Sequence, residues 1–337
     1  MGAQLDIEAL IQEYTPLLVL SPEIPAGSVR KINKDYPHVA PLDFDYHPRD
    51  IKLVLGKSAI GRVRGGGAND WERVLNKMED GGYKKNLDLL KGVKPHDKAR
   101  FWTEYAAIPK DNPNHARTCY ARMVEGSGIL QDRFLVQYWY PYFYNDFWNT
   151  HEMDWETVMI IFAKDAAGPR PTVCAYSAHI GGHWLGWDNV DKADQSLGVA
   201  ADGTHPVVYV ANGSHANYFY EAGLFPTAPP LVAMATDLLK KPGKLIDYTM
   251  SWDDGDRHLV EAKIIPSDRA DWSGDWRWLN QEGLWGSKGK WFDFEFGDSA
   301  PNGPPQAGSR WETPFNWIDT NCTRAPSMVE SRVPSRI

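Results

Sequence analysis

Short runs of β-branched and aromatic residues recur along the chain and predict a protein built mainly from strands. Glycine, proline, asparagine and aspartate separate these runs, as is typical of turns. Most of the connections are too short for helical crossovers, so we expect neighbouring strands to pair antiparallel. The runs that predict strands are residues 17–20, 51–55, 117–124, 134–140, 157–163, 172–177, 206–211, 248–252 and 259–265.

Apolar residues with helical spacing predict a few helices around these strands. The predicted helices are residues 6–13, 70–78, 79–93 and 231–239, the second of them capped by Asn69 or Asp70. The two middle helices belong to a segment, residues 65–98, that starts with three glycines. We interpret this segment as a helical insertion into the sheet protein.

The C-terminal third of the chain combines glycine, proline and serine with scattered tryptophans and predicts coil that wraps the core. Residues 1–320 are therefore expected to form one mainly β domain. We predict an elaborated antiparallel β-sandwich, jelly-roll-like, with helical insertions and a coil-rich C-terminal wrap. Residues 321–337 are expected to be a loose tail.

Two acids stand at the start of the strand predicted at residues 157–163. Because alternate side chains of a strand share a face, Asp154 and Glu156 point the same way as Val158 and Ile160. The opposite face is also apolar, so the strand is buried on both sides. A buried carboxylate is costly unless it is paired, hydrogen-bonded or bound to a cation. The two acids either form a site, together with the nearby His151, or cap a hairpin or pair with arginines.

Two further strands end in a polar, glycine-containing turn that presents a histidine. These are His179, after residues 172–177, and His215, after residues 206–211. A lone histidine in such a turn is usually structural, but loops at one edge of a rigid sheet are also where sites are built. Three histidines beside two carboxylates favour a site. The acidic segment that contains Asp45 and His47 is interpreted instead as a solvated turn.

The residue types leave the chemistry of this site open. Carboxylate oxygens with one histidine favour Mg²⁺, Ca²⁺ or Mn²⁺, and the predicted ligands are Asp146, His151, Asp154 and Glu156. Zn²⁺ is less favoured and would require His179 and His215 as ligands. Without a metal, the same region forms an acid/base site, with His151, Glu156, His179 and His215 as catalytic residues. No organic cofactor is expected, and no Gly-x-Ser-x-Gly motif supports a serine nucleophile.

Aromatic residues surround the predicted site in the sequence. Tyrosine and tryptophan side chains favour an apolar or planar substrate, which a few polar groups would orient. The expected substrate-binding residues are Tyr138, Tyr140, Tyr142, Trp148 and Trp184. The alternative for these residues is ordinary core packing.

Composition narrows the function classes. The net charge of −8 argues against binding to nucleic acid. The three cysteines form no disulfide framework or zinc cluster. The first residues lack a secretory pattern, and no apolar run is long enough for a transmembrane helix, so a cytoplasmic location is expected. The sequence does not indicate an oligomeric state.

Several segments together resemble the vacuolar protein sorting 62-like family. They include Asp45-Tyr-His-Pro-Arg-Asp-Ile, His151-Glu-Met-Asp-Trp-Glu, Ala175-Tyr-Ser-Ala-His-Ile-Gly-Gly and Pro206-Val-Val-Tyr-Val-Ala-Asn-Gly-Ser-His-Ala. The resemblance extends from about Tyr14 to Trp317. The family usually has glycine in place of Met153.

A more distant resemblance connects the chain to necrosis- and ethylene-inducing-peptide-like proteins. Their Gly-His-Arg-His-Asp-Trp-Glu motif is similar to His151, Asp154, Trp155 and Glu156. This resemblance implies a β-sandwich with a divalent cation at the motif and an upstream aspartate that corresponds to Asp146. Those proteins are secreted toxins that bind sphingolipid headgroups, a role that this chain, without an export pattern, is not expected to share.

Three functions compete at this point. The first is a small-molecule enzyme that dehydrates or cyclises an apolar, natural-product-type substrate as a lyase or cyclase of secondary metabolism. The second is a metal-dependent ester or phosphoester hydrolase. The third is a non-enzymatic module that binds a glycan or lipid headgroup through a divalent cation. We expect the enzyme, with a small molecule as its substrate.

Overall fold

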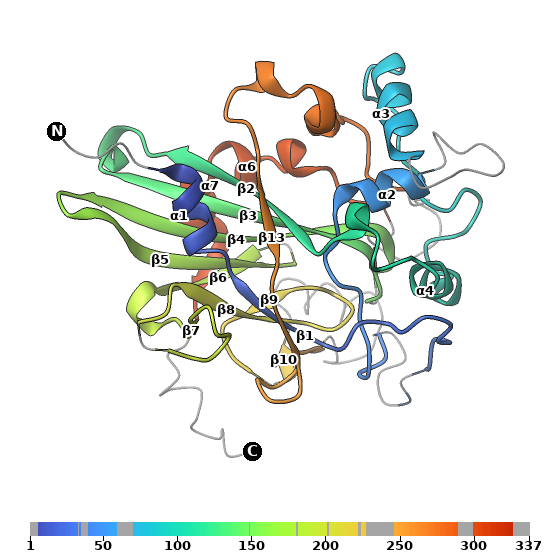
Figure 1. The fold of residues 1–337 in the computed structure, drawn as a ribbon, viewed down its shortest axis with the longest axis horizontal. Helices are drawn as coiled ribbons and strands as arrows, with labels where there is room; N and C mark the ends of the chain where they lie inside the picture. Colours follow the sequence, from blue (N-terminus) through green and yellow to red (C-terminus); the bar gives the residue numbers. More distant parts are fainter. Residues whose placement is uncertain are drawn as a thin grey trace.

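The computed structural model describes residues 6–32, 34, 40–58, 70–147, 149–179, 181–200, 202–221, 224–226, 246–288 and 299–325. Two sheets lie one above the other (Figure 1). The 7-stranded sheet has the order β13 (Glu261–Ile264), β2 (Thr118–Glu125), β3 (Arg133–Asn145), β4 (His151–Asp165), β5 (Gly168–Ala178), β6 (Gly181–Gly186) and β14 (Cys322–Arg324).

The second sheet has five strands and is built around the N-terminal strand. Its order is β12 (Asp256–Leu259), β1 (Leu17–Leu20), β8 (His205–Val210) and β7 (Lys192–Ala193), with β9 (Asn217–Tyr218) also paired to β8. A separate pair joins β10 (Leu224–Pro226) and β11 (Ile246–Tyr248).

Both large sheets are mixed, which corrects the expectation of an antiparallel sandwich. β13 runs parallel to β2, β14 parallel to β6, and β1 parallel to β8. The continuous run from β2 to β6 is antiparallel, as its short connections predict. The parallel partners come from distant parts of the chain, where connection length does not restrict direction. The fold is thus mixed α/β, with more strand than helix.

Side-chain alternation places the main core between the two sheets. Val158 and Ile160 of β4 pack in one cluster with Leu18 and Val208 of the smaller sheet. The intervening Met159 faces the opposite side, where it packs with residues of α7 (Pro314–Asn321). β4 is therefore buried on both faces, as the sequence predicts. Asp154 and Glu156 follow the inter-sheet face of this strand to its end.

Helices gather at one end of the larger sheet (Figure 1). They are α2 (Ile51–Lys57), α3 (Asp70–Asp80) and α4 (Lys98–Ala106), while α1 (Ile7–Glu13) and α6 (Ser309–Glu312) lie elsewhere. None of the helices in the described part of the chain has the length and apolar character of a membrane span. The predictions of helices at residues 6–13 and 70–78 are confirmed.

The strand predicted at residues 51–55 is wrong, because this segment forms α2. Asp50 caps the helix and accepts a hydrogen bond from the backbone N–H of Lys52 at 2.8 Å. Ile51, Val54 and Leu55 then recur with helical spacing and are buried. The cap and the 3.6-residue period outweigh the β-branched composition of the run.

Other element predictions also differ from the structure. Residues 81–97 contain turns where a helix was predicted at 79–93, because Gly81 and Gly82 end α3. The strand predicted at 248–252 ends at Tyr248, and the one at 259–265 is divided between β12 and β13. The predicted tail begins with β14, which pairs with β6. The helix predicted at 231–239 lies outside the described residues.

Glu152 ties the insertion to the sheet. Its buried carboxylate accepts hydrogen bonds from the backbone N–H groups of Leu89 at 3.1 Å, Leu90 at 3.2 Å and Ser287 at 2.6 Å. Strand alternation would place Glu152 on the face of Asp154. The left-handed backbone of Met153, with φ of 54°, interrupts that alternation and directs Glu152 to the other side.

We predict that Glu152→Ala destabilises the protein strongly, because it leaves two buried N–H donors and the partly buried one of Ser287 without their acceptor. An unsatisfied buried donor costs about 1–3 kcal/mol, so the free energy of unfolding should fall by about 3 kcal/mol in a urea titration. Glu72→Ala, on the exposed side of α3, is the control and should change it little. A similar effect of the two variants would contradict this role.

Candidate functional site

The ends of β4, β5 and β8 bring the predicted histidines and carboxylates together. His179 directly follows β5, and His215 follows β8 in a turn closed by its N–H bond to the Ala211 carbonyl at 3.0 Å. His215 Nδ1 donates a hydrogen bond to Asp154 Oδ2 at 3.2 Å. The structure therefore places these side chains at one end of the space between the sheets, while their roles remain predictions.

Asp45 belongs to this group, although its segment was interpreted as a solvated turn. Its side chain is buried and accepts backbone hydrogen bonds from Tyr46 at 2.7 Å and Gly213 at 2.9 Å. His215 Nε2 lies 3.8 Å from Asp45 Oδ1. One imidazole thus lies between two carboxylates, those of Asp45 and Asp154. Burial raises the pKa of Asp45 to about 6, against the opposing charge of His215.

Glu156 is buried beside Asp154 on the same strand face. The Ser177 hydroxyl donates to its carboxylate, and the Thr157 N–H donates to the same hydroxyl at 2.7 Å. Burial and the negative charge of Asp154 raise the pKa of Glu156 to about 8, although the charge of Arg310 opposes the shift. Burial and the charge of Asp154 thus favour the protonated form of Glu156 in the protein without a bound cation.

His179 forms a separate pair with Asp247. Its Nε2 donates to Asp247 Oδ2 at 2.6 Å, and the hydroxyls of Ser214 and Tyr218 donate to the same carboxylate at 2.5 Å each. Burial opposes charge on both partners, but their mutual attraction dominates. The pKa of His179 is consequently raised and that of Asp247 lowered.

His151 and Asp146 differ in how free they are to bind a ligand. His151 Nδ1 donates to the Met153 carbonyl at 2.6 Å, which leaves Nε2 as the available nitrogen of the neutral ring. Burial lowers the pKa of His151. Asp146 already has two cationic partners, Arg30 at 3.1 Å and Lys98 at 2.7 Å. As a metal ligand it would have to give up these ion pairs.

The backbone is strained at three residues of this site. Met153, His179 and His215 have φ values of 54°, 57° and 58°, in the left-handed region that non-glycine residues rarely adopt. Such strain costs about 1–3 kcal/mol per residue and persists where the surroundings enforce it, often at functional sites. The positions of His179 and His215 are thus set by constrained turns.

The predicted aromatic pocket wall is not assembled as expected. Tyr138 and Tyr140 are fully buried in the inter-sheet core, and the Tyr138 hydroxyl donates to the Ile11 carbonyl at 2.9 Å. Trp184 packs on the outer face of the larger sheet. Tyr142 alone of the described four reaches the site, stacked on His215 at 3.9 Å between ring centroids. Trp148 lies outside the described residues.

Among the described residues, three or more potential metal ligands come within 4.8 Å of one another at one place, which lies outside this site. His47, Asp256 and His258 offer ligand atoms within 4.8 Å of one another, so this group could hold a cation. However, His47 Nε2 donates to the Ser21 carbonyl at 2.7 Å, and its Nδ1 accepts from Arg117 Nε at 2.9 Å. A metal bound there would have to displace this guanidinium.

No family model matches the chain, and no curated protein matches it. Among solved structures, it is similar to the non-toxic HaNLP3 protein, at 12% identity over 78% of this chain and 77% of that chain, with a TM-score of 0.31. It is also similar to NLPPya in complex with glucosamine, at 16% identity over 65% of this chain and 70% of that chain, with a TM-score of 0.30. A third similar structure is that of Necrosis and Ethylene inducing Protein 2 from the causal agent of cocoa's Witches Broom disease. The identity is 15% over 67% of this chain and 74% of that chain, with a TM-score of 0.29.

This similarity to necrosis- and ethylene-inducing-peptide-like proteins is too distant, at these TM-scores, to assign a ligand or an activity. The resemblance to the vacuolar protein sorting 62-like family stays an expectation. The function must therefore be inferred from the geometry and chemistry of this chain's own residues.

Sequence reasoning missed Asp45, Asp247 and Ser177 as members of the site. Asp45 stands in a segment rich in charged residues, which is typical of exposed turns. Asp247 is a single acid between Ile246 and Tyr248, and its apolar neighbours were the one indication of burial. Ser177 was considered only as a nucleophile.

We predict that Glu156→Gln stabilises the metal-free protein at alkaline pH. Since the folded-state pKa of about 8 exceeds the ordinary value of 4.5, the native state binds more protons between these values, and the free energy of unfolding falls as pH rises. One pKa unit corresponds to about 1.4 kcal/mol, so the variant should gain at least that much at pH 8.5 and progressively less towards pH 5. Urea titrations in EDTA measure this. Parallel pH profiles for the two proteins would contradict it.

Proposed function

We propose that the cluster of Asp45, Asp154, Glu156 and His151 binds one divalent cation, Mg²⁺, Ca²⁺ or Mn²⁺. Through this cation, the protein would bind the oxygen-rich part of a small ligand, a sugar or a phosphorylated headgroup. The observation that carries the proposal is the buried carboxyl group of Glu156, which lies next to Asp154 and has no cationic partner in contact among the described residues.

The balance of charge supports a cation. The carboxyl groups of Asp45, Glu156 and the neighbouring Asp247 are buried, and that of Asp154 is mostly buried. In the described part of the chain, none of them forms an ion pair with lysine or arginine. His179 compensates Asp247, and His215 is shared by Asp45 and Asp154. Buried carboxylates without counter-charge are costly, and a hard divalent cation is the counter-charge that oxygen ligands prefer.

Unsatisfied polar atoms at the same place support a bound group. His215 Nε2, the Tyr142 hydroxyl and Asn217 Oδ1 are buried without hydrogen-bond partners among the described residues. Buried polar atoms normally have partners, so each of these three atoms is free to take a hydrogen bond from a bound group. Water molecules held by a cation could satisfy these atoms, and the donor set of carboxylates with one imidazole fits such an ion.

The exposed edge of the cluster indicates where a ligand would bind. The Asp154 side chain is 14% exposed and that of His179 is 9% exposed, whereas Asp247 is fully buried. A ligand would therefore approach the cluster on the side of Asp154 and His179. A bound hard cation would offer open positions to ligand oxygens, and the Nε2 of His151 could add a polar contact.

Acid/base catalysis is the second candidate, and the pKa of Glu156 favours it. A carboxyl group with a pKa of about 8 can donate a proton at neutral pH. His179, held by Asp247, or His215, held by Asp154, could accept one. Such a site could dehydrate or cyclise a small molecule. The apolar substrate expected from the sequence has less support, because Tyr138 and Tyr140 are core residues.

We predict that Ca²⁺, Mg²⁺ or Mn²⁺ raises the melting temperature and that EDTA reverses the effect. Binding to the native state alone stabilises by about 2.7 kcal/mol at a hundredfold excess over Kd. Asp154→Asn should abolish the response, while Asp188→Asn, the same change at an exposed position of η3 (Trp187–Asn189), should retain it. Differential scanning fluorimetry measures both.

If no cation changes the melting temperature and elemental analysis finds none in the purified protein, the cation centre is refuted and the acid/base site remains. For the ligand, calorimetry should detect binding of glucosamine or inorganic phosphate in Ca²⁺ and not in EDTA. Vesicles with phosphorylated headgroups, compared with the free compounds, would distinguish a membrane source from a soluble one.

A further inference from the structure

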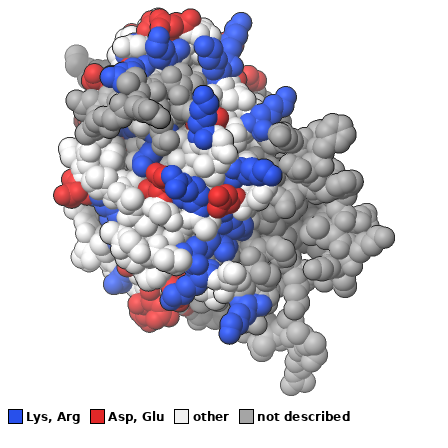
Figure 2. All heavy atoms as spheres, turned by 90° about the vertical axis from the view of Figure 1, so that its right-hand side faces the viewer, with Lys and Arg blue, Asp and Glu red and all other residues white. Residues whose placement is uncertain are grey.

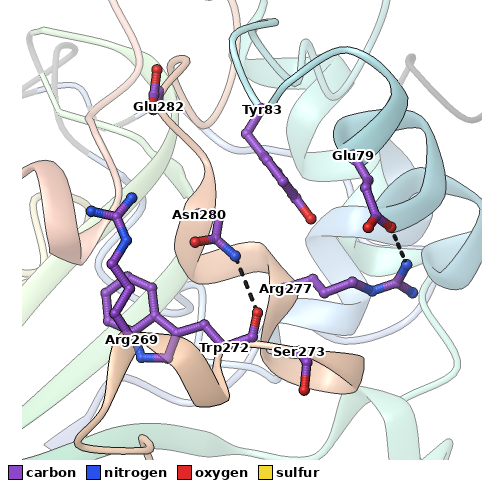
Figure 3. A pocket seen from close by; sticks show the side chains of 8 residues that line it. All are labelled: Glu79, Tyr83, Arg269, Trp272, Ser273, Arg277, Asn280 and Glu282. Carbon is purple, nitrogen blue, oxygen red and sulfur yellow. Dashed lines mark hydrogen bonds and ion pairs between the residues drawn. The ribbon is translucent and has the colours of Figure 1, made fainter.

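A pocket of about 400 Å³ lies between the end of α3 and the segment of η4 (Arg269–Asp271) and η5 (Gly274–Asn280) (Figure 3). None of the residues of the carboxylate cluster lines it. Its volume falls in the range of small-molecule sites, about 300–1,000 Å³. The following inference does not depend on the function proposed above.

Two aromatic side chains form walls of this pocket and are held in place. The Tyr83 side chain points into the pocket (Figure 3). Its backbone has a φ of 58°, and its carbonyl accepts hydrogen bonds from Glu282 at 2.7 Å and Gly283 at 3.1 Å. The indole of Trp272 donates to the Pro266 carbonyl at 3.1 Å and packs edge-on against Trp311. Both walls are therefore preorganised, which lowers the entropic cost of binding.

Hydrogen-bonding groups between these walls are also fixed. Arg277 donates to the Gly274 carbonyl at 3.0 Å, to Asn76 at 2.9 Å and to Glu79 at 2.8 Å. The Asn280 amide donates to the Trp272 carbonyl at 3.1 Å, which leaves its oxygen as an acceptor. Because Arg277 neutralises Glu79, this acid does not oppose an anionic ligand.

Arg269 supplies an uncompensated positive charge at the pocket. Its guanidinium lies 5.4 Å from the ring centroid of Trp272, and it has no acidic partner in the described part of the chain. The other acid of the lining, Glu282, is exposed and points away from the centre (Figure 3). On the face that α3 and α4 occupy, lysine and arginine also prevail over acids (Figure 2). With Glu79 and Arg277 paired to each other, Arg269 is the cationic group of the lining that can pair with an anion.

We propose that this pocket binds a small aromatic carboxylate. The flat ring would pack against Tyr83 and Trp272, and the carboxylate would pair with the guanidinium of Arg269, which suits planar, bidentate recognition. The Asn280 oxygen would accept a hydrogen bond from a ring substituent. A one- or two-ring acid fits the volume of the pocket.

The test compares two probes of nearly the same shape, the anion 2-naphthoate and its neutral amide, 2-naphthamide. We expect calorimetry to show at least tenfold tighter binding of the acid. Arg269→Gln should abolish the difference between the probes, and Arg269→Lys should retain part of it. Arg269 is exposed, so neither variant should unfold the protein. Arg170→Gln, at another exposed arginine, is the matched control and should bind like the wild type.

Asp154→Asn should also leave 2-naphthoate binding unchanged, which separates this pocket from the carboxylate cluster. A loss of binding in that variant would place the ligand at the cluster and refute the proposal. Equal affinities of the acid and the amide, or no binding of either at millimolar concentration, would also refute it.

Discussion

Burying several carboxyl groups at one end of the space between two sheets is the constraint on which the rest of this structure depends. Asp154 and Glu156 lie on the inter-sheet face of β4 because the strand period puts them there, in line with Val158 and Ile160. Desolvation penalises their negative charge, so the surroundings must supply protons, hydrogen bonds or a cation. The neighbouring turns place two histidines beside these acids, and the backbone is strained at both, His179 and His215. Their imidazoles each contact a buried aspartate.

Hydrogen bonds and histidines compensate this cluster only in part. Asp247 is satisfied by three donors, from His179, Ser214 and Tyr218, and its pKa is lowered despite burial. Glu156 accepts from the Ser177 hydroxyl, no lysine or arginine of the described segments forms an ion pair with it, and its pKa is raised to about 8. The contrast shows that the fold can stabilise a buried carboxylate where it supplies enough donors. At Glu156 the fold supplies too few donors to stabilise the negative charge, so the carboxyl group needs a proton or a divalent cation.

Local patterns predicted the parts of the fold that depend on local periodicity. The two-residue period of β4 indicated which face carries the acids, and the polar turns after β5 and β8 indicated the two histidines. The mixed sheets could not be predicted in this way, because β13 and β14 pair with strands from distant parts of the sequence. Asp45 was missed because its burial depends on the Gly213 turn, 168 residues away. Tyr138 and Tyr140 were predicted to line a pocket but lie in the core, because tyrosine side chains are equally suited to core packing.

The most direct test of the central claim is anomalous diffraction from a crystal soaked in Mn²⁺. We predict an anomalous peak beside the carboxylates of Asp154 and Glu156, and no such peak in crystals of Asp154→Asn grown and soaked in the same way. A wild-type map without a peak at these carboxylates, or with a peak only at His47, Asp256 and His258, would contradict it.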